Sequence, residues 1–147
     1  VQLLVPGKCD VRLAQLAARG QYSRLLRSGV QLFEYQPQML HMKRYLLDDV
    51  VYVGSANLDL RSLNVNYELL VRLEDPGFAA EGHAAFEGDL SRSERIEPGR
   101  WNRRGWWNRL LERLASAVLV RFDLRLAMRQ LHRIQVRRGR GGWPRLS

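Results

Sequence analysis

Hydrophobic residues recur at strand and helix spacing along the first part of the chain. The apolar run at residues 1–6 predicts a buried strand. Residues 10–29 carry apolar side chains every three or four positions, which predicts an amphipathic helix with Asp10 as its N-cap and a break in its pattern at Gly20. The alternating run at residues 30–35 predicts a second strand. A strand, a helix and a strand in this order indicate an α/β layered domain.

Three further runs predict strands. Residues 39–47 and 50–54 flank a short acidic turn, so they predict a hairpin. Residues 66–74 predict the strand that follows, with three apolar residues on one face. These are Leu69, Val71 and Leu73.

The second half of the chain changes to a helical pattern. Residues 78–96 predict a helix, and the Pro/Gly-punctuated residues 97–105 predict a linker. Residues 106–134 predict one long amphipathic helix, in which apolar side chains recur every four residues beside a winding stripe of arginines. The apolar positions are Leu110, Leu114, Val118, Phe122 and Leu126. The arginines are Arg109, Arg113, Arg121, Arg125, Arg129 and Arg133.

Charge divides the chain after residue 90. The formal net charge is +9, from 24 basic and 15 acidic residues. Residues 1–90 hold nine basic and eleven acidic side chains, whereas residues 91–147 hold fifteen arginines and four acidic residues. We therefore predict a folded half-domain at residues 1–90 and a basic linker with an amphipathic helix at residues 91–147. Such a cationic extension indicates contact with an anionic surface, either lipid headgroups or nucleic acid.

Composition excludes several classes of protein. A chain with 46% hydrophobic and 27% charged residues is typical of a globular domain rather than a disordered one. Cys9 is the single cysteine, which excludes a disulfide framework, and His83 and His132 lack the spacing of metal ligands. No uncharged stretch approaches the length that spans a bilayer. Because Val1 already lies in a predicted strand, we expect the chain to be a C-terminal fragment of a longer protein.

The predicted hairpin carries the side chains of a phosphate site. Residues two apart on a strand point to the same side, so His41 and Lys43 are expected to enter one cleft. Histidine can act as a nucleophile or general acid, and lysine can neutralise phosphoryl oxygens. Ser55 and Asn57 also share a face and would reach the cleft as neutral donors. Glu68, on the next strand, would hold one imidazole nitrogen so that the other faces the substrate.

The pattern H-x-K-x4-D followed by G-S-x-N resembles the signature of the phospholipase D superfamily. Its residues here are His41, Lys43, Asp48, Gly54, Ser55 and Asn57. Five residues separate Asp48 from Gly54, one fewer than the commonest family spacing, which implies a shorter hairpin turn. The flanking stretches VQLLVPGKCD, FEYQPQMLHMK and GSANLDLRSLNVNYEL narrow the resemblance to the second half of bacterial cardiolipin synthases.

This resemblance implies a phospholipase D-like layered mixed β-sheet flanked by helices, with a C-terminal amphipathic helical extension. It also implies an enzyme that transfers a phosphatidyl group between phosphatidylglycerol molecules through a phosphohistidine, without a metal or other cofactor. The implied catalytic residues are His41, Lys43, Asp48 and Glu68, and the implied phosphate-binding residues are Ser55 and Asn57. A second motif must come from a missing N-terminal half or a second copy, and we assign general acid/base work to His41.

Several alternatives stay open at this point. Asp48 either takes part in the chemistry or braces the hairpin turn. The chain could also belong to a nuclease-like phosphodiesterase that completes its site by homodimerisation and holds nucleic acid with its basic extension. A third alternative is a degenerate half that only binds membrane or nucleic acid. The C-terminal helix either packs on the domain or lies at a membrane surface, as expected of a protein at the bacterial cell membrane, peripheral or anchored through other residues.

Overall fold

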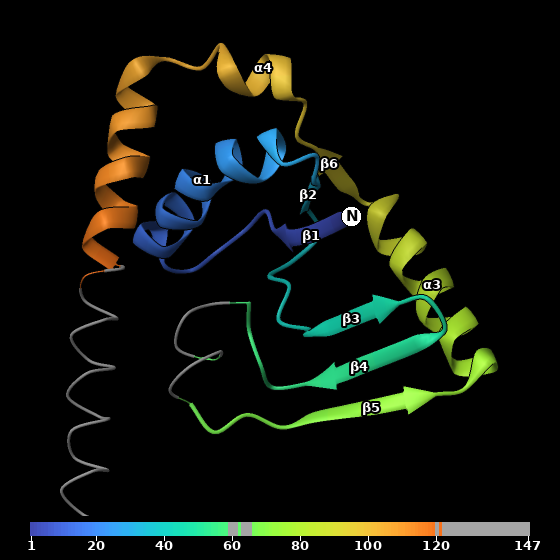
Figure 1. Ribbon diagram of the computed structural model, residues 1–147. Coiled ribbons are helices and arrows are strands. Elements are labelled where there is room, and N and C mark those ends of the chain that lie inside the picture. Colours follow the sequence, from blue (N-terminus) through green and yellow to red (C-terminus); the bar gives the residue numbers. More distant parts are fainter. Residues whose placement is uncertain (59–61, 63–65, 120, 122–147) are drawn as a thin grey trace, which may run out of the picture.

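The computed structural model describes residues 1–58, 62, 66–119 and 121, and it shows two small sheets with helices packed against them (Figure 1). The strand orders are β1-β2-β6 in one sheet and β3-β4-β5 in the other. This mixed architecture confirms the α/β layered class that the sequence predicts.

The first sheet is built on a strand, helix, strand unit. Strand β1 (Gln2–Pro6) runs parallel to β2 (Gln31–Tyr35), and helix α1 (Arg12–Arg27) makes the crossover between them. Strand β6 (Ser93–Arg95) pairs antiparallel with the other side of β2. The helix predicted over residues 78–96 is therefore wrong at its C-terminal end, because those residues add a strand to this sheet. The division of the chain after residue 90 stays a prediction.

Helix α1 differs from the sequence prediction at two positions. Its N-cap is Val11, with no side-chain capping hydrogen bond, so the prediction that Asp10 caps the helix is wrong. The helix also continues through Gly20 without a break. A Cβ added at Gly20 would lie 2.8 Å from the carbonyl oxygen of Glu112 and 3.1 Å from Cβ of Ser116. Glycine is needed here because a second helical segment passes close to the α1 backbone.

The second sheet is an antiparallel meander. Strand β3 (Arg44–Leu47) turns through Asp48 and Asp49 into β4 (Val50–Gly54), which pairs with β5 (Leu70–Glu74). The predicted hairpin is confirmed. However, β3 begins at Arg44 instead of residue 39, and β5 begins at Leu70 instead of residue 66. Of the three residues predicted on one face of this last strand, Leu69 therefore precedes β5.

Helix α3 (Pro76–Leu90) packs against the second sheet and links it to the first (Figure 1). Asp75 caps the helix, since its carboxylate accepts a hydrogen bond of 2.7 Å from the backbone N–H of Phe78. Gly82 lets the helix approach the sheet, because a Cβ there would lie 3.1 Å from Leu46 and 3.5 Å from Val51.

The core of the first sheet includes a residue from the predicted linker. Tyr22, Leu32, Ile96 and Trp101 are buried together, and the Trp101 ring lies 5.1 Å from that of Tyr22. Trp101 belongs to the short helix α4 (Pro98–Asn102), so the segment predicted as a Pro/Gly-punctuated linker contains a helix that packs into the core. Burial of the large indole orders this segment despite its proline and glycine.

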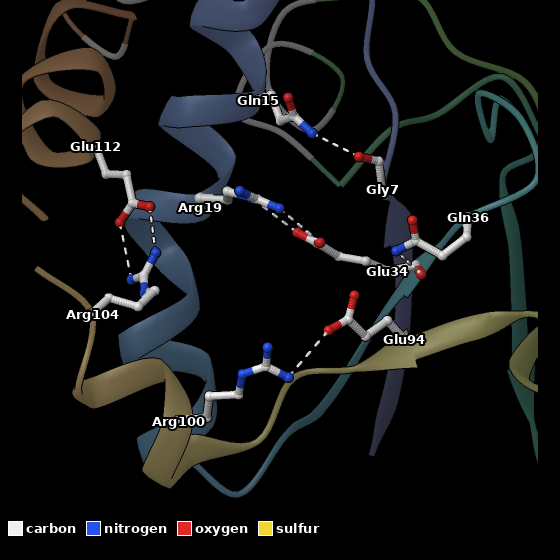
Figure 2. Close-up of polar contacts among 9 residues, drawn as sticks. All are labelled: Gly7, Gln15, Arg19, Glu34, Gln36, Glu94, Arg100, Arg104 and Glu112. Atoms are coloured by element: carbon white, nitrogen blue, oxygen red, sulfur yellow. Dashed lines mark hydrogen bonds and ion pairs between the residues drawn. The ribbon is translucent and has the colours of Figure 1, made fainter. Parts of the chain in front are cut away.

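Charged pairs join the elements around this core (Figure 2). Arg19 of α1 donates to both carboxylate oxygens of Glu34 on β2, at 3.0 and 2.8 Å. Glu34 is buried, and such bidentate hydrogen bonds satisfy a carboxylate that has left water. Burial, followed by the charge of Glu34, raises the pKa of the neighbouring Tyr22 hydroxyl. Tyr22 therefore stays neutral in the core.

Residues 106–119 form a helical segment that stands beside α1 (Figure 1). Arg104, at the turn before the segment, donates to Glu112 at 2.5 and 3.1 Å (Figure 2), and Gln21 donates to Ser116 at 2.7 Å. This confirms the beginning of the predicted long helix, and its continuation through Phe122 and Leu126 lies outside the described residues. Within the described part of the chain, no helix combines the length and the apolar character needed to cross a membrane.

Candidate active site

One end of the β3-β4-β5 sheet brings three chain segments together. The backbone N–H of Gly54 donates to the carbonyl oxygen of Lys43 at 3.2 Å. On the other side, the N–H of Ser55 donates to the carbonyl oxygen of Leu69 at 3.0 Å, and the N–H of Leu69 donates to Oγ of Ser55 at 3.0 Å. Lys43, Ser55 and the residues before β5 are therefore direct neighbours across the sheet.

Gly54 is required at this end because the backbone of the next strand passes too close for a side chain. A Cβ added at Gly54 would collide with the carbonyl oxygen of Leu69 and lie 3.0 Å from Cα of Leu70. The small residue before Ser55 thus lets the last residues of β4 and the start of β5 approach each other. The glycine of the G-S-x-N motif therefore helps to position Ser55.

Replacing Gly54 with alanine is expected to lower the free energy of unfolding by about 1–3 kcal/mol, because the added methyl group must push the two strands apart. Urea unfolding of the chain, followed by circular dichroism, measures this change. Gly88→Ala is the matched control, since Gly88 lies in α3 with nothing near its Cβ position. It should raise stability by about 0.5–1 kcal/mol. If Gly54→Ala were as stable as the Gly88→Ala control, the steric account would be contradicted.

His41 and Lys43 lie beside each other, as the sequence predicts, but not on a strand. Both precede β3, which begins at Arg44. The ammonium nitrogen Nζ of Lys43 lies 3.0 Å from Nδ1 and 3.2 Å from Nε2 of His41, and it donates to the carbonyl oxygen of His41 at 2.6 Å. The contact thus depends on the lysine side chain folding back onto the preceding residues. Strand alternation, the reason given from the sequence, does not produce it.

Ser55 and Glu68 form the second pair of the site. Oγ of Ser55 donates to Oε2 of Glu68 at 2.5 Å, and the amide of Asn66 donates to Oε1 at 3.2 Å. Hydrogen bonds from Ser55, Ser62 and Asn66, with a smaller contribution from the charge of Lys43, hold the pKa of the Glu68 carboxyl below its usual value. In the structure Glu68 contacts Ser55 and Asn66, and not the imidazole that the sequence interpretation assigned to it.

The pKa of Glu68 gives a direct test of this arrangement. Since the folded pKa lies below the unfolded one, the hydrogen bonds stabilise the site above the unfolded pKa and are lost as the pH falls through the folded value. Carboxyl-carbon NMR titration should show the Glu68 resonance moving below pH 4.5, the ordinary value. Ser55→Ala should raise this pKa, because it removes the largest cause of the shift.

Ser91→Ala is the control for this titration, because Ser91 donates instead to the carbonyl oxygen of Gly88 at 2.8 Å, at the end of α3. It should leave the Glu68 titration unchanged. An equal response to both variants would rule out the Ser55–Glu68 hydrogen bond as the cause.

The two remaining candidates are Asn57 and Asp48. Asn57 is exposed in the loop after Ser55. Asp48 occupies the turn at the opposite end of the hairpin, roughly 16 Å along the strand from Lys43 at about 3.3 Å per residue. Its backbone has a φ of 52°, and its carbonyl oxygen lies 3.1 Å from Nε2 of His83. This placement favours the turn-bracing role of Asp48 over direct participation in chemistry.

Sequence reasoning assigned no site role to two residues that position the site. The hydroxyl of Tyr45 on β3 donates to the carbonyl oxygen of Ala56 at 2.9 Å, so it holds the Gly-Ser-Ala-Asn turn against the hairpin. Asn66 holds the Glu68 carboxylate. The placement of Tyr45 on the strand opposite the turn was a usable signal. Asn66 belongs to a stretch that carries the family resemblance, but the sequence did not indicate its hydrogen bond to Glu68.

Several of the described residues of the site are exposed. His41, Ser55 and Asn57 are exposed. The same chain segments also carry exposed apolar side chains, namely Met39, Met42, Leu58, Tyr67 and Leu69. Apolar residues gathered around polar groups are typical of a surface that another protein segment or a ligand covers.

The groups at this sheet end suit phosphoryl chemistry. An ammonium and a hydroxyl can bind the non-bridging oxygens of a phosphodiester, while an imidazole next to them can attack phosphorus or transfer a proton. Such groups carried on a hairpin of a mixed α/β fold define the phospholipase D class of proteins. Among the described residues, no group of three histidine, cysteine, aspartate or glutamate side chains is placed to hold a metal ion.

Comparison with known proteins agrees with this class. The domain family described as "Cardiolipin synthase, PLD-like domain" matches residues 1–90. The chain therefore belongs to the phospholipase D-like domain family of the cardiolipin synthase type. Proteins named cardiolipin synthase A from Erwinia tasmaniensis and Yersinia pseudotuberculosis are 35% identical to it over 115 residues, and that of Klebsiella pneumoniae is 36% identical over the same length.

These alignments cover 78% of the chain but 24% of each relative. The chain thus spans about a quarter of the length of the curated relatives it matches. No solved structure matches the chain with significant similarity.

Proposed function

We propose that this chain is the second catalytic half of a phosphatidyltransferase of the cardiolipin synthase type. The observation that carries the proposal is the convergence of Lys43, His41, Ser55 and Glu68 at one sheet end in a chain similar to cardiolipin synthase A. The substrate is phosphatidylglycerol, and the enzyme works at the bacterial cell membrane. No metal ion takes part in the proposed chemistry.

In the proposed reaction the two halves divide the work. A histidine nitrogen of the other half attacks phosphorus, a nitrogen–phosphorus bond forms, and the bond from phosphorus to the glycerol headgroup breaks. His41 donates its proton to the departing glycerol oxygen. It then accepts a proton from a hydroxyl of a second phosphatidylglycerol, which attacks phosphorus and releases the first histidine. The products are cardiolipin and glycerol.

The other side chains stabilise charge in this scheme. Lys43, whose ammonium already faces the imidazole, neutralises a non-bridging phosphoryl oxygen. Oγ of Ser55 donates to Glu68, and in the complex it turns to the phosphate together with the amide of Asn57. Glu68 retains its negative charge because its pKa is lowered. In the assembled site it can therefore stabilise the imidazolium form of His41.

Exposed apolar side chains next to Glu68 in the sequence support a site that is formed by two protein surfaces. Tyr67 is 95% exposed and Leu69 is 71% exposed, and they are the sequence neighbours of Glu68. Removing such side chains from water stabilises an interface, so a second protein surface is expected to cover them. The covering part is the missing N-terminal half with the first motif, or a second copy of the chain.

A product assay of the whole protein tests the proposal. Phosphatidylglycerol in detergent micelles should give cardiolipin and free glycerol in equal amounts, measured by mass spectrometry and an enzymatic glycerol assay. Supercoiled plasmid DNA should remain intact under the same conditions. Nicked plasmid with no cardiolipin would instead identify a phosphodiesterase acting on nucleic acid. Formation of neither cardiolipin nor nicked plasmid would overturn the assignment of an active enzyme.

A further inference from the structure

The helical segment 106–119 packs on the body of the protein with its polar side. Its buried residues are Glu112 and Ala115, and the carbonyl oxygen of Glu112 and Cβ of Ser116 both lie close to Gly20 of α1. Its larger apolar side chains face away from the body. Trp107, Leu111, Leu114 and Val118 are 62%, 52%, 54% and 57% exposed.

These exposed residues form one continuous stripe. Successive spacings of four, three and four residues place Trp107, Leu111, Leu114 and Val118 within one face of a helix, which turns by about 100° per residue. Leu110 and Trp106 widen the stripe at its beginning, and the rings of Trp106 and Trp107 stack at 3.8 Å. We call these six residues the outer apolar face.

The orientation of this segment is fixed by specific contacts and is not a matter of loose packing. Arg104 holds the buried Glu112 with two hydrogen bonds and lies 3.0 Å over the ring of Trp101. Ser116 accepts from Gln21, and Gly20 leaves room for the Glu112 backbone. Rotating the outer apolar face inward would leave Glu112 without its partner, which is costly for a buried carboxylate.

The charge beside the outer apolar face is entirely positive. Between residues 98 and 122, the sequence has one acidic residue, the buried Glu112. Arg103, Arg109, Arg113 and Arg121 are exposed, and none of them forms an ion pair with another described residue. Their guanidinium groups therefore remain available to an anionic partner.

We propose that the outer apolar face and these arginines seat the protein on an anionic lipid bilayer. Leucine and valine side chains enter the acyl region, the two indoles lie at the headgroup boundary, and the arginines bind lipid phosphates. The choice of lipid among anionic partners rests partly on the proposed function. A helix of a partner protein fits less well, because a stripe flanked by cations alone would need an acidic match along its whole length.

Vesicle sedimentation of the full chain tests this surface. With vesicles of equal parts phosphatidylglycerol and phosphatidylcholine in 0.1 M salt, binding is expected, and it should be far weaker with phosphatidylcholine alone. The double variant Leu111→Gln/Leu114→Gln should lower the partition coefficient about tenfold or more, because two apolar side chains lose their insertion. Arg109→Gln/Arg113→Gln should weaken binding severalfold in 0.1 M salt and little in 1 M salt.

Matched controls separate this face from general effects of composition. Leu13→Gln/Leu47→Gln removes two exposed leucines elsewhere, and Arg24→Gln/Arg27→Gln removes two exposed arginines of α1. Both control variants should change the partition coefficient less than about twofold. Unchanged vesicle binding in Leu111→Gln/Leu114→Gln would overturn the proposal. Absence of vesicle binding, with a dimer that this variant dissociates in analytical ultracentrifugation, would overturn it too and assign the face to self-association.

Turnover distinguishes this proposal from the proposed function. In the whole protein, Leu111→Gln/Leu114→Gln should keep its activity on detergent-dispersed phosphatidylglycerol while losing vesicle binding. A variant of His41 should lose activity while keeping vesicle binding. Failure of the second result alone would concern the catalytic assignment and leave the membrane face intact.

Discussion

Replacing His41 with alanine is expected to lower the turnover of phosphatidylglycerol by the whole protein by a factor of about 10²–10⁴, the range that positioned acid/base groups supply. The imidazole next to the Lys43 ammonium is, among the described residues, the group of this chain best placed to move a proton at the open end of the sheet. Initial rates of cardiolipin formation measure the loss. His83→Ala is the matched control and should retain activity within a few-fold, because His83 contacts the turn at the far end of the hairpin.

A leaving-group experiment separates the two roles that a histidine can have. A phosphatidyl ester of p-nitrophenol needs little protonation as p-nitrophenolate departs. If His41 is the general acid, His41→Ala should still release a burst of p-nitrophenolate from this donor. Absence of the burst, with normal folding by circular dichroism, would make His41 the nucleophile. Full turnover of phosphatidylglycerol by His41→Ala would show that the catalytic site lies elsewhere.

Trp101→Ala is expected to lower the free energy of unfolding of the chain by about 3–5 kcal/mol. Trp101 is buried against Tyr22, its indole N–H donates to Ser23 at 3.2 Å, and Arg104 covers its ring. Truncation would leave a cavity between α1 and α4 and free the arginine that holds Glu112. Urea unfolding, followed by circular dichroism, measures the difference.

Trp107→Ala is the control for this change, since the same truncation is made at an exposed position. It should alter stability by less than about 0.5 kcal/mol. Trp101→Phe provides a milder variant if the alanine variant does not fold, because it keeps an aromatic ring against Tyr22 and loses the donor to Ser23. Equal stability of Trp101→Phe and the unaltered chain, together with a small loss in Trp101→Ala, would contradict the role of this core.

The contrast between Trp101 and the hairpin shows what the sequence could predict. The strands around Asp48 and Asp49 were predictable because period-two alternation and a turn signal agree locally. The segment around Trp101 carries Pro98 and Gly99, which locally indicate a linker. Its helix forms because the indole is buried against α1. The indole N–H of Trp101 donates to Ser23, which lies 78 positions earlier in the chain. A local sequence pattern does not predict a contact with such a distant residue.

The same limit applies to the site and to the C-terminal segment. The sequence predicted that His41 and Lys43 lie side by side, and the structure places them so, because residues two positions apart in a short motif are close in any case. It did not identify the partners of Glu68, which depend on how the loop between β4 and β5 returns to the sheet. The apolar stripe of residues 106–119 was predictable, but its outward orientation follows from the Arg104–Glu112 pair.

The backbone of Asp48 bears on how relatives of this protein are recognised. A φ of 52° lies in the left-handed region, which glycine, asparagine and aspartate tolerate best. A search pattern that demands aspartate at this place therefore selects for a type of bend as much as for an acid. Chains with asparagine or glycine there, and with the histidine and lysine intact, should be kept as candidate enzymes when genomes are screened.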